Sequence, residues 1–231
     1  MKGLVLLLSA VVVLGFAACN GDSGTSASTG PLALDQRVVT EEDAPDSKPD
    51  PVETGVTVTT ADEFISSLGD SFVNPSADDV AALKSAGFVQ AIDDTRFLPE
   101  GEMTSHSRSN PHIRTTVMQF QAAEGAKTAD DIEHEDNLRP CPENCATSTE
   151  EFDVDEIPGA LGSRRYATQE NIDATGAADV QPYDEYQIVF TDGVFAYRVR
   201  LHGSPGSVSE DQARDIAQSL YDRVHGRPPV S

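Results

Sequence analysis

The sequence has no tryptophan, three cysteines and only four lysines among its 231 residues. The lack of tryptophan weakens the case for an aromatic platform that would stack on a sugar ring. Sixteen Lys and Arg residues stand against thirty-nine Asp and Glu residues, so the net charge is -23. A field of this sign repels nucleic acid and anionic lipid headgroups, and neither is expected as a partner. The acidity fits a highly soluble protein, a salty habitat or weak binding of divalent cations.

Long apolar runs are also scarce. The one that exists, from Leu4 to Phe16, is shorter than the roughly 20 residues that a membrane-spanning helix needs. It follows Met1-Lys2 and ends in the small residues Ala17-Ala18 directly before Cys19, which is the layout of a secretory signal. We therefore expect residues 1–18 to be a signal peptide. This signal peptide could be an ordinary one that is cleaved beside an incidental cysteine, or it could belong to a protein that is lipidated at Cys19.

The stretch Leu14-Gly15-Phe16-Ala17-Ala18-Cys19 resembles the lipobox of bacterial lipoproteins. In that family the cysteine is diacylated and becomes the first residue of the mature chain. The resemblance implies that Cys19 carries a lipid, palmitate for example, and that the protein is anchored at the extracytoplasmic face of the cell membrane. The small polar residues 20–24 that follow agree with it.

The other two cysteines, Cys141 and Cys145, lie close together in Cys-Pro-Glu-Asn-Cys. Export brings a chain to a compartment where disulfides persist, so we expect these two residues to be bonded to each other. A structural zinc would need about four ligands, and the sequence has no second cysteine pair. A thiol redox motif would need a redox fold around it.

Composition divides the remainder of the chain into two parts. Residues 19–56 are rich in Gly, Ser, Thr, Pro and acidic residues and lack a sustained apolar period, which predicts a lipidated cysteine followed by a disordered acidic tether. Residues 57–231 are long enough for one globular domain with a sizeable core.

A β-hairpin is the clearest element, and it covers residues 184–201. Asp192-Gly193 separates two apolar runs, and Asp-Gly is typical of a two-residue type I′ turn. In that register Glu185 pairs with Arg200, and Arg198 lies on a face that we expect to be wet, so that its loss costs under about 1 kcal/mol. Alternation places these apolar side chains together on the other face: Tyr186, Ile188, Phe190, Phe195, Tyr197, Val199 and Leu201.

An amphipathic helix is expected to follow the hairpin. Ser209-Glu210-Asp211-Gln212 is a capping box, and Gly226 followed by Pro228 provides a stop. Residues on one face of this helix are Ala213, Ile216, Ala217, Leu220 and Val224. The apolar face of the hairpin is the nearest surface in sequence on which this stripe could pack.

Capping and periodicity signals predict the other elements, and the whole pattern favours an α+β domain. We expect one mainly antiparallel sheet of about five or six strands, covered by helices, with the hairpin and helix at its C-terminal end. In chain order the expected elements are helices at 60–68 and 76–86, strands at 88–98 and 113–120, a helix at 124–138, strands at 151–157 and 164–169, and a linker at 171–182.

This order, with the turn Ile157-Pro158-Gly159-Ala160 and the terminal hairpin plus helix, is similar to small exported lipoproteins of high-GC Gram-positive bacteria. Some of those proteins have a PsbP-like α/β sandwich. The likeness covers about residues 87–226. It implies a binding or accessory role and no catalytic residue.

Candidate catalytic or metal-binding residues are few. His106 and His112 share a Ser-rich loop, and Asp130 or Asp131 lies within one helical turn of His134. Either set could hold a cation, or could simply be solvated surface. The sequence has no His-Glu-x-x-His, no phosphate-binding Gly loop and no dinucleotide fingerprint, so no cofactor is expected.

Two classes of function remain open. The first is a lipid-anchored accessory or binding module of the cell envelope, with a protein, a peptide or an apolar molecule as its ligand. The second is an envelope hydrolase or metal-dependent enzyme that uses His106, His112 or His134. A deep apolar pocket would favour ligand carriage, whereas a His and a carboxylate within hydrogen-bond reach would favour catalysis.

Overall fold

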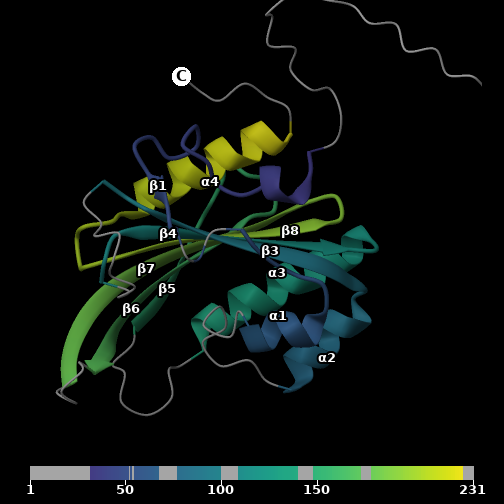
Figure 1. The fold of residues 1–231 in the computed structure, drawn as a ribbon, viewed down its shortest axis with the longest axis horizontal. Coiled ribbons are helices and arrows are strands. Elements are labelled where there is room, and N and C mark those ends of the chain that lie inside the picture. The colour runs from purple at the N-terminus through teal and green to yellow at the C-terminus, as the bar shows by residue number, and fades with distance from the viewer. Residues whose placement is uncertain are drawn as a thin grey trace, which may run out of the picture. The chain divides into compact units, whose positions relative to one another are not determined.

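An eight-stranded antiparallel sheet forms the centre of the computed structural model (Figure 1). The structure describes residues 32–225 except for 52, 54, 68–76, 100–108, 140–147 and 173–177. Its elements, in chain order, are η1 (Leu34–Gln36), β1 (Lys48–Pro49), β2 (Val56–Val58), α1 (Ala61–Ser67), α2 (Ala77–Ser85), β3 (Phe88–Phe97), β4 (His112–Phe120), α3 (Ala123–Leu138), β5 (Ser148–Phe152), β6 (Leu161–Ile172), β7 (Ala178–Asp192), β8 (Phe195–Gly203) and α4 (Glu210–Val224).

The strand order is β1-β3-β4-β8-β7-β6-β5, with β2 also paired to β3, and every pairing is antiparallel. The α+β class is therefore confirmed, but the sheet has more than the five or six strands expected. The strands that were not expected, β1 and β2, have two and three residues, which is too short for a recognisable alternation. Strand β7 begins at Ala178, inside the segment expected to be a linker.

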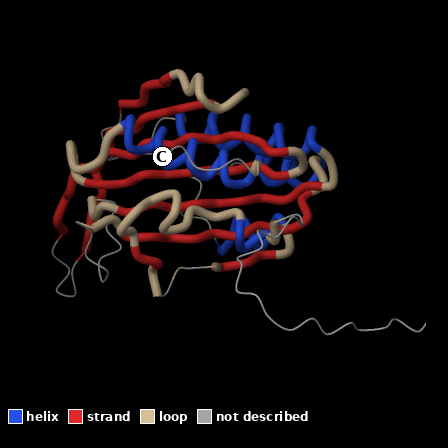
Figure 2. Tube along the Cα trace, turned by 90° about the horizontal axis from the view of Figure 1, so that it is seen from above, coloured by secondary structure: helices blue, strands red, loops and turns tan. Residues whose placement is uncertain are grey.

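Helices cover both faces of this sheet. Figures 1 and 2 show α4 and the N-terminal segment over one face, and Figure 1 places α1, α2 and α3 over the other. None of the helices in the described part of the chain is both long and apolar enough to cross a membrane. The expectation that one face of the hairpin is exposed to water is wrong, because α3 covers it.

The hairpin of β7 and β8 has the expected faces but a different turn. Asp192 pairs with Phe195, so the two loop residues are Gly193 and Val194 rather than Asp192 and Gly193. Gly193 has a φ of 60°, and glycine at the first central position is the requirement of a type II′ turn. The register moves by two residues, which preserves both faces while Phe190 now lies opposite Tyr197.

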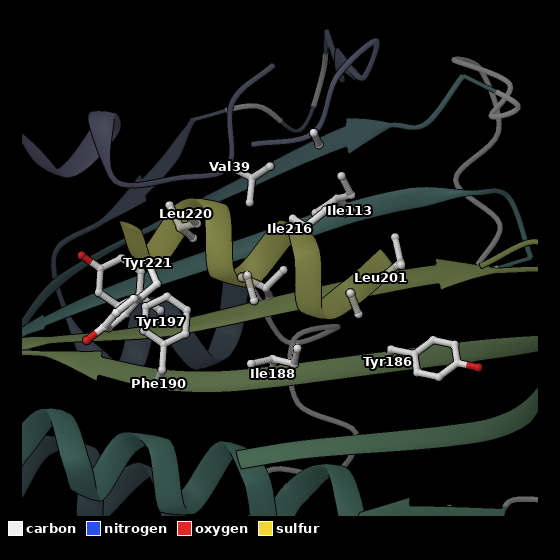
Figure 3. Close-up of a cluster of buried hydrophobic side chains, with 14 of the residues drawn as sticks. Val39, Ile113, Tyr186, Ile188, Phe190, Tyr197, Leu201, Ile216, Leu220 and Tyr221 are labelled. Atoms are coloured by element: carbon white, nitrogen blue, oxygen red, sulfur yellow. The ribbon is translucent and has the colours of Figure 1, made fainter. Parts of the chain in front are cut away.

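The face toward α4 is the larger apolar core (Figure 3). The helix begins at an N-cap, Ser209, whose hydroxyl accepts a hydrogen bond from the backbone of Gln212, and its expected stripe faces the sheet. Phe190 is fully buried and stacks on Tyr197 with ring centroids 4.7 Å apart. Phe195 is only partly buried, because it lies at the turn beside the guanidinium of Arg37.

The N-terminal segment is part of this core, although the sequence assigned residues 19–56 to a disordered tether. Val39 is fully buried in the apolar cluster, together with Val38 and Ala44. Asp43 accepts a hydrogen bond of 2.7 Å from Arg223 of α4. The folded domain therefore includes residues that the sequence assigned to the tether, and Asp43 of this segment is fixed by its ion pair with Arg223.

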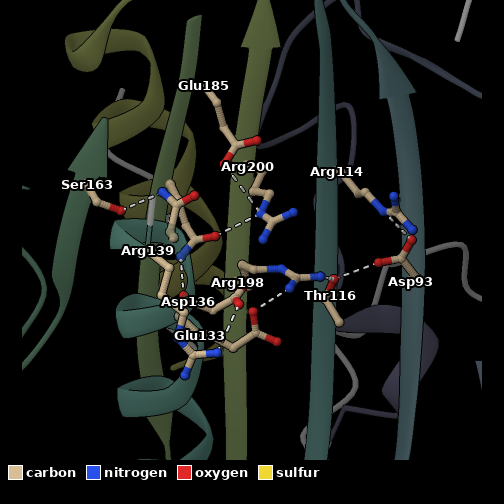
Figure 4. Close-up of polar contacts among 12 residues, drawn as sticks. Asp93, Arg114, Thr116, Glu133, Asp136, Arg139, Ser163, Glu185, Arg198 and Arg200 are labelled. Carbon is tan, nitrogen blue, oxygen red and sulfur yellow. Dashed lines mark hydrogen bonds and ion pairs between the residues drawn. The ribbon is translucent and has the colours of Figure 1, made fainter. Parts of the chain in front are cut away.

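The opposite face carries a buried polar layer under α3 (Figure 4). Arg198 has an exposed fraction of 0% and contacts the carboxylate of Glu133 and the hydroxyl of Thr116. Arg200 donates to the side chain of Gln187 at 2.7 Å. Burial raises the pKa of Glu133, while Arg198 and Arg200 oppose that rise. These charges pair with one another across the helix–sheet boundary, so the layer has a structural role.

Candidate functional site

A cleft lies at the edge of the sheet where β5 ends and β6 begins. Its volume is about 520 Å³. The expected strand at 151–157 is displaced, because β5 covers Ser148–Phe152 and residues 153–160 form a loop instead. The lining residues come from β5, this loop, β6 and α3: His134, Glu151, Phe152, Asp153, Val154, Asp155, Ile157, Pro158, Gly159, Ala160, Leu161 and Gly162.

Two apolar side chains hold the loop in place. Val154 and Ile157 are buried in the core under α4, with exposed fractions of 6% and 1%. Between them and β6 the chain turns at Gly159, which has a φ of 77°, a conformation that favours glycine. The backbone of Ala160 donates to that of Ile157 at 3.1 Å. The loop is therefore anchored from below and closed by a hydrogen bond, which gives the cleft a fixed wall.

Gly162 allows β5 and β6 to approach each other closely at the floor of the cleft. A Cβ atom at this position would lie 2.4 Å from the Phe152 ring, a distance that real contacts do not reach. The same ring contacts the aromatic ring of Tyr186 on β7, with centroids 6.5 Å apart. The requirement for glycine here is a requirement for close packing, and it leaves the Phe152 ring fixed between the sheet and the cleft.

The rim of the cleft is acidic. Glu151, Asp153 and Asp155 are exposed lining residues. Arg214 of α4 lies over the Phe152 ring, 5.1 Å from its centroid, and pairs with Glu156 at 3.5 Å and with Glu210 at 2.7 Å. The accessible lining is mainly polar, and Phe152 and Leu161 provide its apolar part, so the cleft favours ligands that combine positive charge with a small apolar group.

His134 brings a titratable ring from α3 to the cleft. Its Nε2 lies 3.0 Å from a carboxylate oxygen of Glu151, and the side chain is only 10% exposed. Its Nδ1 is buried and has no hydrogen-bond partner among the described residues. Glu151 itself is 68% exposed, so it can contact both the histidine and an incoming ligand.

The candidate cation site on α3, the alternative to a solvated acidic face, does not form around His134. The imidazole pairs with Glu151, whereas Asp130 is buried and one of its oxygens has no partner among the described residues. Burial raises the pKa of Asp130 well above its usual value, and the nearby Glu133 and Asp131 raise it further. A carboxyl group that is held toward its neutral form is a poor cation ligand. The described residues contain no group of three or more His, Cys, Asp or Glu side chains that could hold a metal ion.

The other candidate residues are not brought to the cleft. His112 lies on β4 and stacks on His202 of β8, with centroids 4.6 Å apart. Strand β4 is four strand spacings from β5, or roughly 19 Å at about 4.8 Å per spacing, so His112 and His134 do not share a site. His106, Cys19, Cys141 and Cys145 lie outside the described residues.

The chain matches no family model, and no curated protein is significantly similar to it. Among solved structures it is similar to the extracellular domain of PknH from Mycobacterium tuberculosis, with a TM-score of 0.52 and 11% sequence identity. The match covers 86% of this chain and 99% of that domain. At this identity the likeness shows a shared fold.

The sequence did not predict the cleft, because the wall of the cleft is a loop whose sequence has the alternating pattern of a strand. Residues 151–155 alternate between acidic and apolar, as an edge strand does, and the alternation ends at Asp155-Glu156. In the structure the apolar members Val154 and Ile157 are loop anchors. The turn at Pro158-Gly159 was the one signal that pointed to an irregular segment here.

Proposed function

We propose that the protein is a lipid-anchored binding module of the cell envelope, and that its ligand site is the cleft between β5 and β6. The observation that carries the proposal is the cleft itself, with a volume of about 520 Å³, a mainly polar lining and an acidic rim. Its size is within the range typical of small-molecule sites. The likeness in fold to an extracellular domain supports an extracytoplasmic location.

The burial and the pairing of the polar groups in the cleft favour binding over catalysis. The single imidazole of the cleft, His134, is turned toward Glu151 and is largely buried. Val154 and Ile157 fix the wall of the cleft, and their apolar side chains carry no group that could act as an acid, a base or a nucleophile. The groups left accessible are carboxylates, which attract a cation but do not by themselves make a reaction centre.

Filling the cleft should abolish binding without unfolding the protein. Leu161 lines the cleft and is 37% exposed, so Leu161→Trp places a large ring in the space at little cost to the core. The probe is a set of small apolar amines with their neutral analogues, followed by NMR of the Val154 and Ile157 methyl groups. We expect saturable shifts for the amines in the native protein and none in Leu161→Trp.

Val180→Trp is the matched control for this experiment. Val180 is 58% exposed on β7 and does not line the cleft, so the same enlargement there should leave binding unchanged. Equal loss of binding in both variants, or amines that shift the methyl groups equally in Leu161→Trp, would show that the cleft is not the site.

The proposed anchor is Cys19, which would hold the domain near the membrane. Twelve residues, 20–31, separate Cys19 from Leu32, where the described domain begins. At about 3.5 Å per extended residue they span at most roughly 42 Å. The proposed anchor would therefore hold Leu32 within that distance of the membrane surface.

Replacing the anchor should change the location of the protein. We expect Cys19→Ser to be released from the membrane fraction or to remain unprocessed, and mass spectrometry of the native protein to find an acylated N-terminal peptide that begins at Cys19. Native protein that is fully soluble, with an unmodified Cys19, would refute the anchor and leave the binding proposal to its own test.

A further inference from the structure

Strand β5 is an edge of the sheet. All five of its residues pair with β6, from Ser148 opposite Tyr166 to Phe152 opposite Gly162, and the register has no shift. No other described strand pairs with β5. An edge strand of this kind has a row of backbone N–H and C=O groups on its outer side, which is a template for a further strand.

Several of the protections that edge strands usually carry are missing from the described residues of β5. Its sequence, Ser-Thr-Glu-Glu-Phe, contains no proline and no lysine, and it has no bulge. The opposite edge of the sheet is different, because β3 is covered there by the short strands β1 and β2. Acidic side chains are the feature of β5 that can still oppose pairing with another strand.

That charge argues against a second copy of this chain as the partner. Glu150 and Glu151 are exposed on opposite faces of β5, and Asp153 and Asp155 continue the acidic series into the cleft. Two such edges placed side by side would bring carboxylates together, in chains that each carry a net charge of -23. A basic strand would instead gain cross-strand ion pairs.

The edge also leads directly into the cleft. Phe152 is the last residue of β5 and lines the cleft, together with Val154 and Leu161. A strand paired along β5 and extended beyond Phe152 would therefore bring its next side chains over the side chains of Phe152 and Leu161. Backbone pairing would supply affinity, and the cleft and its rim would select the side chains.

We propose that the ligand is an extended segment of a basic polypeptide, which adds to β5 as a further strand and places an apolar side chain in the cleft. This inference rests on the proposed function, since it assigns a ligand class to the same cleft. Strand addition predicts that binding needs three things together: free backbone N–H groups in the ligand, positive charge on its side chains and the carboxylates of the rim.

The test titrates the purified full chain with three blocked peptides of equal length, measured by isothermal calorimetry and by hydrogen exchange of the β5 amides. The first alternates Lys and Val, the second alternates Glu and Val, and the third is the Lys/Val peptide with a central proline, which cannot donate to a strand. We expect the first to bind and to protect β5 amides, the second not to bind, and the third to bind at least about tenfold more weakly.

Two double variants identify the surface that is used. Glu151→Gln/Asp153→Asn removes two rim charges, and Glu41→Gln/Glu42→Gln removes two exposed charges from the N-terminal segment. We expect the first to weaken Lys/Val binding at least about tenfold and the second to leave it unchanged. Equal effects of the two variants, or equal binding of the proline peptide, would overturn strand addition. If the peptide fails while small amines still occupy the cleft, this inference is wrong and the binding proposal stands.

Discussion

Arg198→Ala should destabilise the protein by about 3–5 kcal/mol, as much as truncation of a large core side chain. The guanidinium has an exposed fraction of 0%, and it contacts Glu133, whose side chain is 1% exposed. Its other terminal nitrogen donates to Thr116 at 2.6 Å. Removing it leaves a buried carboxylate without its main counter-charge, and that loss is large in a domain whose total stability is typically 5–15 kcal/mol.

Urea unfolding followed by circular dichroism measures this effect. Phe190→Ala, on the other face of the hairpin, is expected to cost a similar 3–5 kcal/mol, because Phe190 is fully buried. Arg214→Ala is the surface control and should cost under about 1 kcal/mol, since its partner Glu210 is 39% exposed. An Arg198→Ala variant as stable as Arg214→Ala would show that the layer under α3 is wet.

The double variant Arg198→Met/Glu133→Leu separates burial from charge. Replacing both members of a buried ion pair by apolar residues of similar size is often neutral or stabilising, whereas removing one member is not. We therefore expect the double variant to recover most of the stability that Arg198→Ala loses. Its recovery would assign the cost to the orphaned carboxylate rather than to the lost volume of the arginine.

The sequence predicted the faces of the hairpin but not what covers them. Alternation correctly placed Arg198 opposite the apolar face, because strand periodicity is local. The partner of Arg198 is Glu133, which lies 65 residues earlier in the chain. An arginine on a strand face is solvated in most sheets, and nothing within reach of a local pattern shows that a helix will bring a carboxylate to it.

The type of the hairpin turn and the loop that forms the cleft could not be predicted from the sequence, for related reasons. Asp192-Gly193 is the strongest local hairpin signal, but the structure uses Gly193 one position earlier in the turn, which lets Phe190 stack on Tyr197. Likewise the apolar residues Val154 and Ile157 are buried, as the pattern of residues 151–157 predicts, but they belong to a loop and not to a strand. In both places the local sequence leaves two conformations nearly equal in free energy, and tertiary packing determines which of them forms.

A chain that begins at residue 57, where the sequence placed the domain boundary, should fold poorly. It loses Val38, Val39 and Ala44 from the core, and burial of each valine contributes about 1.5–3 kcal/mol. It also leaves Arg223 without Asp43 and the backbone carbonyls of Gln36 and Val38, to which it donates at 2.6 Å each. A chain that begins at residue 32 keeps all of these contacts.

Thermal unfolding of the two truncated chains beside the full chain tests this boundary. We expect the chain from residue 32 to unfold at the temperature of the full chain, and the chain from residue 57 to be insoluble or to unfold at least about 10 °C lower, since 1 kcal/mol shifts the midpoint of a domain of this size by about 2–4 °C. Asp43→Ala in the full chain removes the ion pair to Arg223 alone and should produce an intermediate loss. If the chain from residue 57 is as stable as the others, the N-terminal segment lies on the domain without contributing to its core.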